Sequence, residues 1–120
     1  MNLDLHNNYD LLSIEYNIEQ RFITIIWQRS YERWVPPNIP ETLRLLFKDV
    51  SLFKCRERDK DLPYTEDSCL SFIGLLSENM WKEIEENYSN DLLINEHLIM
   101  IFQSDTVFKI KCENVELMIK

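Results

Sequence analysis

The sequence predicts an α+β protein that is mainly β, built as a curved antiparallel sheet, half-barrel or meander with one amphipathic helix at about residues 78–88. Apolar and polar residues alternate along most of the chain, which is the pattern of strands with one buried face. The chain has no alanine and one glycine, whereas Ile, Phe and Tyr are plentiful. This composition favours strands, although a genome rich in A and T would produce the same bias. A single segment places apolar residues at helical spacing.

The length fits one domain spanning residues 1–120. A chain of this size buries about two-thirds of its unfolded surface in a single core. Hydrophobic residues make up 45% of the chain, which is enough apolar surface to offset the entropy lost on folding. The sequence contains no linker and no repeat, so we expect one independently folding domain.

The N-terminal quarter predicts two strands joined by a turn. Residues 10–17 alternate between apolar and polar side chains, which indicates a strand with one solvated face. The segment from Asn17 to Gln20 then predicts the turn. Residues 21–29 are apolar on both faces, which is typical of a central or well-covered strand.

The middle of the chain predicts two loops on either side of a further strand region. Residues 30–41 contain three prolines and therefore predict an extended loop. Residues 42–48 and 50–55 alternate again and form either one bent strand or a tight pair. Residues 56–68 begin with charges of alternating sign, which indicates a solvated loop.

The C-terminal half predicts a buried strand, the helix and a meander. Residues 69–76 form a compact apolar run in which Gly74 marks a bulge or a close approach. Ser77 is the expected N-cap of the helix at 78–88. Residues 98–119 alternate in three segments separated by two turns, which predicts a meander of three strands.

Charge and cysteine content limit the partners and the compartment that we expect. The net charge is −8, and such a surface repels nucleic acid and anionic lipid but attracts a basic protein. Cys55, Cys69 and Cys112 are odd in number and lack paired spacing, so we expect unpaired core thiols in a reducing compartment. No secretion signal or membrane span is visible. We therefore predict a cytoplasmic protein with no nucleic-acid and no membrane partner.

The residues that enzymes and metal sites require are not found in recognisable patterns. A single glycine excludes the usual phosphate-binding loops. His6, His97 and the cysteines are too scattered to predict a metal site. A nucleophilic pair of Cys69 or Cys112 with His97 is conceivable, but buried structural cysteines are far commoner. We predict no enzymatic activity, no cofactor and no metal.

The loops between residues 30 and 67 form the most informative surface. Tyr31, Trp34 and Tyr64 lie in proline-rich or charged segments where no strand pattern requires an aromatic residue. Such aromatics either anchor an interface or cap the open ends of a sheet. The candidate partner-binding residues, beside the acidic helix face, are Trp34, Glu57, Asp59, Asp61, Tyr64, Glu66 and Asp67.

Three segments of the chain, residues 43–53, 58–70 and 97–119, carry a resemblance to a known group of proteins. In strand pattern and a few polar positions they resemble small bacterial β-proteins, including immunity proteins of polymorphic toxin systems. The resemblance implies a curved antiparallel sheet or half-barrel with a helix against it. It also implies a role in binding and neutralising a toxin, and it identifies no catalytic residue.

Three hypotheses of function follow. The leading one is a non-enzymatic protein-binding domain, with an immunity protein that neutralises a basic toxin domain as the specific case. The alternative is a small-molecule-binding or hydrolytic half-barrel with an enclosed pocket. The third is a structural subunit that pairs through exposed apolar edge strands. The sequence leaves the oligomeric state open.

Overall fold

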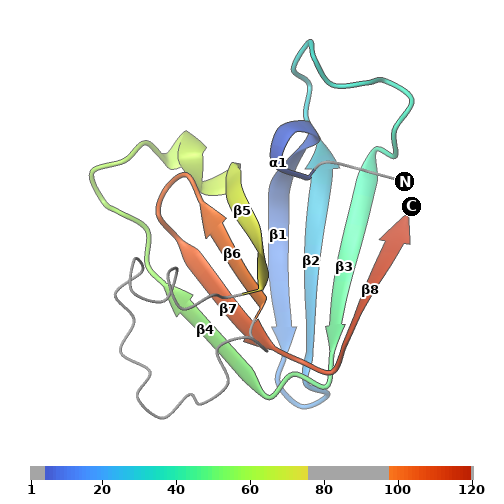
Figure 1. Cartoon of the computed structure of the whole chain (residues 1–120), viewed down its shortest axis with the longest axis vertical. Coiled ribbons are helices and arrows are strands. Elements are labelled where there is room, and N and C mark those ends of the chain that lie inside the picture. The colour runs from blue at the N-terminus through green and yellow to red at the C-terminus, as the bar shows by residue number, and fades with distance from the viewer. Residues whose placement is uncertain (1–4, 76–97, 120) are drawn as a thin grey trace.

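The protein is mainly β, as the alternation predicts. The computed structural model describes residues 5–75 and 98–119, and in these residues eight strands form two antiparallel sheets (Figure 1). The first sheet contains, in spatial order, β1 (Tyr9–Asn17), β2 (Phe22–Arg29), β3 (Thr42–Lys48) and β8 (Asn114–Ile119). The second contains, in spatial order, β4 (Leu52–Arg56), β7 (Val107–Lys111), β6 (Leu98–Phe102) and β5 (Leu70–Leu75).

The helical segments that the structure describes are short. They are α1 (Leu5–Asn8) and the 3-10 helix η1 (Tyr64–Ser68). The amphipathic helix expected at 78–88, with its acidic face, lies outside the described residues. Within the described part of the chain, no helix has the length and apolar character needed to cross a membrane.

A long two-stranded ribbon joins the two sheets. β3 runs on into β4, and β7 runs on into β8, so each chain segment bends from one sheet into the other. The amide of Ser51 donates to the Lys111 carbonyl (2.8 Å), and the amide of Glu113 donates to the Lys48 carbonyl (3.1 Å). Asp49 takes the turn with a positive φ of 55°, a conformation that Asp tolerates better than most residues. Residues 42–56 are therefore a bent strand, which decides between the two sequence-based alternatives.

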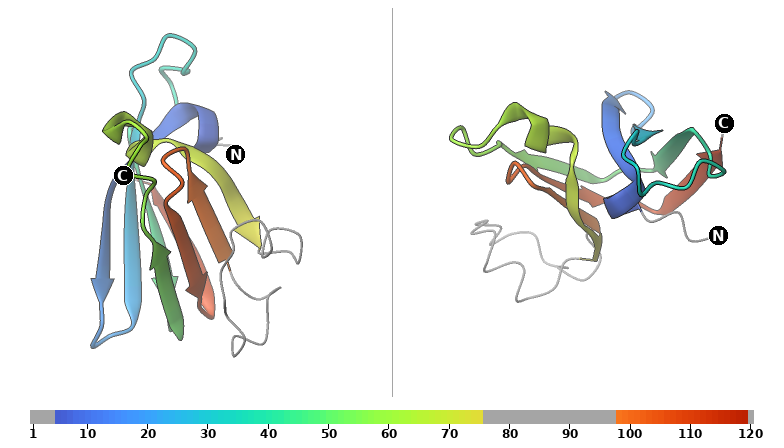
Figure 2. Two further views of the ribbon diagram at one scale, coloured as in Figure 1. Left: turned by 90° about the vertical axis from the view of Figure 1, so that its left-hand side faces the viewer. Right: turned by 90° about the horizontal axis from the view of Figure 1, so that it is seen from above.

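The core fills the space between the two sheets, which lie at an angle to each other (Figure 2). Trp27 of β2 stacks on Phe102 of β6 across this space, with ring centroids 6.3 Å apart. Phe102 in turn meets Phe108 of β7 edge to face at 5.3 Å. Trp27 and Phe102 are almost completely buried, so aromatic packing between sheets holds the fold together.

The expected meander at the C-terminus is only partly formed. β6 and β7 make the predicted hairpin, whose turn places Asp105 at a positive φ of 70°. Arg56 of β4 donates hydrogen bonds to the carboxylate and the carbonyl of Asp105. β8 does not pair with β7 but crosses to the first sheet and pairs with β3. The bend after Cys112 carries the chain away from its hairpin neighbour.

Two further sequence-based expectations need correction. β5 is an edge strand among the described residues, and Ser71 and Phe72 are exposed, so it is not the buried strand that its apolar run predicts. The irregular pairing lies between Leu70 and Phe72, while Gly74 is the point of close approach, since a Cβ there would lie 2.9 Å from the Phe72 ring. The three cysteines are free but are not core thiols: Cys55 on β4 is exposed, and Cys69 and Cys112, just before β5 and just after β7, are only partly buried.

Candidate functional site

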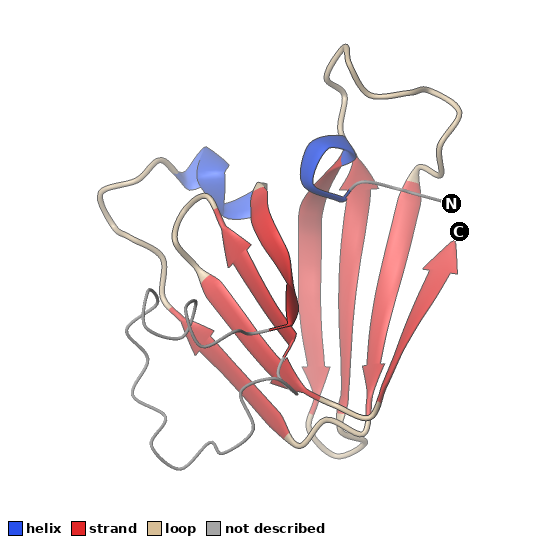
Figure 3. Cartoon of the chain, viewed as in Figure 1, coloured by secondary structure: helices blue, strands red, loops and turns tan. Residues whose placement is uncertain are grey.

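Two hollows lie on either side of η1, at the end of the molecule opposite the bends. α1, η1 and the loop after β2 all lie at this end (Figure 3). We call this region the η1 surface. It comprises residues 6–11, 30–34, 55–60, 64–69 and 103–108. The hollows have volumes of about 430 Å³ and 580 Å³.

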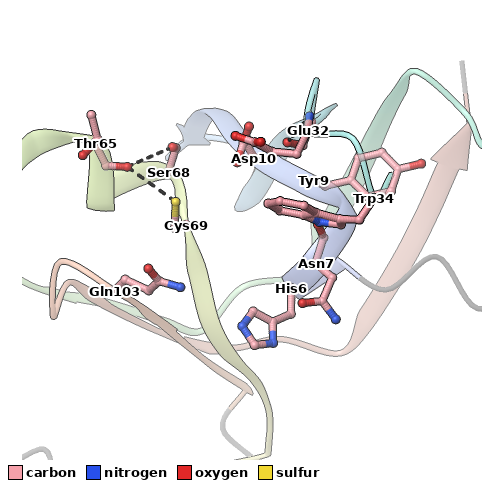
Figure 4. A pocket seen from close by; sticks show the side chains of 11 residues that line it. His6, Asn7, Tyr9, Asp10, Glu32, Trp34, Thr65, Ser68, Cys69 and Gln103 are labelled. Atoms are coloured by element: carbon pink, nitrogen blue, oxygen red, sulfur yellow. Dashed lines mark hydrogen bonds between the residues drawn. The ribbon is translucent and has the colours of Figure 1, made fainter. Parts of the chain in front are cut away.

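The first hollow lies between the start of β1 and the end of η1 (Figure 4). One side is formed by α1 and β1 together with the loop after β2, and the other by η1 and the β6–β7 turn. Asp10 and Glu32 lie in it, whereas none of the described residues that line it is lysine or arginine. The hollow therefore carries negative charge that its own lining does not neutralise.

Trp34 forms an exposed aromatic wall of this hollow. Its indole Nε1–H donates to the Asn7 carbonyl (3.0 Å), yet 66% of the residue remains exposed. The loop behind it is held by Arg29, whose guanidinium donates to the carbonyls of Pro37 (2.9 Å) and Ile39 (2.8 Å). Trp34 is thus fixed in position while its ring faces solvent.

Burial and a neighbouring carboxylate both affect Asp10 in the first hollow. Partial burial raises the pKa of Asp10, and the nearby charge of Glu32 raises it further. Both causes disfavour the ionised form of Asp10, so at neutral pH the site holds charge at a cost to stability. A cation placed between these carboxylates would remove that cost.

Asp10→Asn is therefore expected to stabilise the free protein at pH 7. The pKa of Asp10 is higher in the folded than in the unfolded chain, so its protonated form contributes stability that is fully present below the unfolded-state pKa. That contribution is lost as pH rises through the folded-state pKa. Thermal unfolding should give a higher Tm for the variant at pH 7 and equal Tm values near pH 3. A lower Tm for the variant at pH 7 would contradict this electrostatic account.

Cys69 lies in the same hollow but is poorly suited to act as a nucleophile. Burial raises the pKa of its thiol, and the charges of Asp10 and Glu66 raise it further. The thiol donates to the Thr65 carbonyl at 3.5 Å. A thiol with a raised pKa remains protonated at neutral pH, whereas the thiolate is the reactive form. The histidine that lines this hollow is His6, and His97 lies outside the described residues.

Arg58 organises the second hollow. Its Nε donates to the Asp67 carboxylate (2.7 Å) and its Nη2 donates to the Leu62 carbonyl (2.7 Å). The same guanidinium lies over the Tyr64 ring, 4.4 Å from its centroid, a favourable cation–π contact. The hydrogen bond from Arg58 lowers the pKa of Asp67 and keeps its carboxyl ionised. Arg58 therefore joins Leu62, Tyr64 and Asp67 of this loop through one guanidinium.

The structure divides the sequence-predicted candidates between the two hollows. Trp34 lines the first hollow, and the residues lining the second are Glu57, Tyr64 and Asp67. The remaining candidates, Asp59, Asp61 and Glu66, line neither hollow. The Asp59 carboxylate instead accepts the Asp61 amide (2.9 Å), and its own amide donates to the Ser104 carbonyl (2.8 Å), so Asp59 has a structural role in the turn.

Sequence reasoning missed three residues of this site: Asp10, Glu32 and Arg58. Asp10 and Glu32 come from different elements and meet only through the fold. The alternating charges of residues 56–61 indicated a solvated loop and did not distinguish Arg58 from its neighbours. In the described part of the chain, no three His, Cys, Asp or Glu side chains converge on a common point for a metal ion.

No protein-family model, no curated protein and no solved structure matches the chain. The basis for a functional proposal is therefore the η1 surface itself: two hollows, two fixed exposed aromatic rings, and the carboxylates of Asp10 and Glu32, of which Asp10 has a raised pKa.

Proposed function

We propose that this chain is a non-enzymatic protein-binding domain whose η1 surface holds a basic protein partner. The observation that carries the proposal is the first hollow, where Asp10 and Glu32 lie beside the fixed, exposed ring of Trp34. An immunity protein that neutralises a basic toxin domain is the specific case, which rests on the resemblance described above and on the net charge of −8.

Exposed aromatic residues that are already fixed make effective interface anchors. Trp34 is held by Asn7 and Tyr64 by Arg58, yet 66% and 81% of these residues are exposed. An anchor that is ordered before binding loses little conformational entropy when the partner arrives. Tyrosine and tryptophan are also the residue types that most often dominate binding energy.

The first hollow fits a lysine or arginine side chain of the partner. A cation between Asp10 and Glu32 would offset their mutual repulsion, and the indole of Trp34 offers the face that cations prefer. The overall charge of −8 would speed the encounter with a basic protein, and added salt would slow it. The hollow therefore supports recognition of a basic side chain and the net charge supports long-range attraction.

Capture from a lysate of the host organism, at low salt and then at rising salt, tests the proposal. The immobilised wild-type chain is compared with Asp10→Asn/Glu32→Gln and with the control Glu19→Gln/Glu41→Gln. Both double variants remove two negative charges, but Glu19 and Glu41 are exposed and lie outside the η1 surface. We expect a basic protein that the wild type and the control retain and that the site variant binds at least about tenfold more weakly.

Three results would contradict the proposal. The first is that no protein is retained at low salt. The second is that both double variants lose the partner equally, which would mean that the net charge of the chain, and not the first hollow, determines binding. The third is retention that does not change with salt, because a basic partner held by carboxylates must bind more weakly as screening increases.

A small molecule in the first hollow is the second candidate, and the volume favours it. About 430 Å³ lies within the usual range of ligand pockets. Ligand pockets are mostly apolar, however, whereas this lining is rich in polar side chains, and the exposure of Trp34 shows that the hollow opens to solvent. Mass spectrometry of the purified protein after denaturation would favour this candidate if a small cation were released by the wild type and not by Asp10→Asn/Glu32→Gln.

A further inference from the structure

The strand β8 differs from the other edge strands of the two sheets. All six of its residues are exposed, and its apolar residues expose about half of their surface: Val115 49%, Leu117 48%, Met118 47% and Ile119 54%. It pairs with β3 on one side only, so within the described residues its other side presents unpaired backbone groups (Figure 1). Such an edge is a template for a further strand.

Three of these side chains continue the core-facing side of the first sheet. Val115 is in register with Phe47, Leu117 with Leu45, and Ile119 with Leu43. Leu43 and Phe47 are fully buried and Leu45 packs partly against the core. The apolar face of the sheet therefore extends past the core and ends in an exposed stripe along β8.

The other three edge strands carry features that discourage strand pairing. The pairing of β1 is irregular between Leu11 and Ser13, and that of β5 between Leu70 and Phe72. β4 has two basic residues among its five, Lys54 and Arg56. Bulges and charges are the usual protection of sheet edges. The register of β8, in contrast, runs unbroken from Asn114 to Ile119.

We propose that β8 pairs antiparallel with β8 of a second copy of this chain and joins the two first sheets into one continuous sheet. A twofold axis at Leu117 places Leu117 opposite itself and Val115 opposite Ile119 of the second copy, all on the apolar face. This proposal is independent of the partner proposed for the η1 surface, which lies on other elements.

The charges of β8 are compatible with a second copy. The charged residue of β8 is Glu116. Its carboxylate Oε1 forms an ion pair with Lys48 Nζ of the same chain at 2.9 Å. In the register centred on Leu117, Glu116 lies opposite Met118 of the second copy, so no like charges face each other across the new pair. Two chains of charge −8 therefore meet along a strand that is locally neutral.

The area of the contact predicts a weak dimer. Six residues of one strand per copy bury well under the total of about 1,200 Å² found in stable standard-size interfaces. Dimer formation should consequently depend on concentration in the range used for biophysical work. It should also strengthen as salt rises, because salt screens the repulsion between two acidic chains.

Sedimentation velocity of the full chain over a roughly hundredfold range of concentration, at low and high salt, tests this inference. We expect a dimer whose population rises with concentration and with salt. Leu117→Lys, which places like charges at the twofold axis, should raise the dimer dissociation constant at least about tenfold. The control Leu12→Lys, at an exposed position on β1 at the opposite edge of the sheet, should leave it unchanged.

A monomer at every concentration and salt, or equal weakening by the two lysine variants, would overturn the inference. Hydrogen exchange provides a second test that needs no variant: amides of residues 114–119 in the wild type should exchange more slowly as concentration rises, and unchanged exchange would also overturn it. The direction of the salt effect separates this test from that of the η1 surface, because a basic partner binds more weakly as salt rises, whereas this dimer strengthens.

Discussion

Replacing Trp27 with alanine is expected to lower the free energy of unfolding by about 3–5 kcal/mol. Trp27 is fully buried and stacks on Phe102 of the opposite sheet. Its indole N–H has no hydrogen-bond partner among the described residues, so the loss comes from packing between the sheets. Because small domains are stable by only about 5–15 kcal/mol, the variant should be close to unfolding at room temperature. Urea denaturation followed by circular dichroism measures the change.

The matched comparison for this prediction is Trp34→Ala, in which the same side chain is removed from an exposed site. That variant should change the free energy of unfolding by less than about 1 kcal/mol. If Trp27→Ala cost as little as Trp34→Ala, the stacked contact between the two sheets would not be what holds them together.

Trp34→Ala is expected to weaken binding of the captured basic partner about 30-fold, the loss typical of an interface anchor. Its ring is fixed by the hydrogen bond to Asn7 and forms a wall of the hollow that holds Asp10 and Glu32. Removing it takes away both apolar contact area and the aromatic face offered to a cation. Isothermal titration of the purified partner against wild type and variant measures the change.

Tyr31→Ala is the control for this second prediction. Tyr31 is 87% exposed in the same loop but lines neither hollow. The Tyr31→Ala variant should bind the partner with the same affinity as the wild type. If Tyr31→Ala and Trp34→Ala lost equal amounts of binding affinity, the loop would contribute only general apolar contact. That result would contradict a specific role for the first hollow.

Local sequence patterns predict the strands of this protein well because each strand has its own alternation. The run of residues 21–29, apolar on both faces, becomes β2, which lies between β1 and β3. The three prolines of residues 30–41 keep that segment out of the sheets. The polar residues 103–105 become the turn between β6 and β7. In each case the deciding interaction is within the segment or with its immediate neighbour.

Features that depend on distant contacts were not predictable. The alternation of residues 114–119 indicates a strand but does not say that it pairs with β3 instead of β7, since the pattern of a strand does not identify its neighbour. The cysteines show the same limit, because a local apolar pattern does not reveal that Cys55 is exposed and that Cys69 and Cys112 are only partly buried. The bends near residues 49–51 and 112–113 carry both chain segments from one sheet into the other and thereby place β8 beside β3.

The candidate site was predictable only where single residues stood out from their surroundings. Trp34 and Tyr64 were found because aromatic residues are unexpected in proline-rich and charged loops. Asp10 and Glu32 gave no such signal, since each is one acidic residue among 21 and they meet only when β1 and the loop after β2 come together. Sequence therefore located the aromatic anchors of the η1 surface but not its pair of carboxylates.

Hydrogen–deuterium exchange of the chain with and without its purified partner tests the central claim most directly. Binding through the η1 surface predicts slower exchange at residues 6–11, 30–34, 55–60, 64–69 and 103–108, and unchanged exchange along β2 and β3. Slower exchange confined to β8, or to the faces of the sheets away from η1, would contradict the claim that this surface holds the partner.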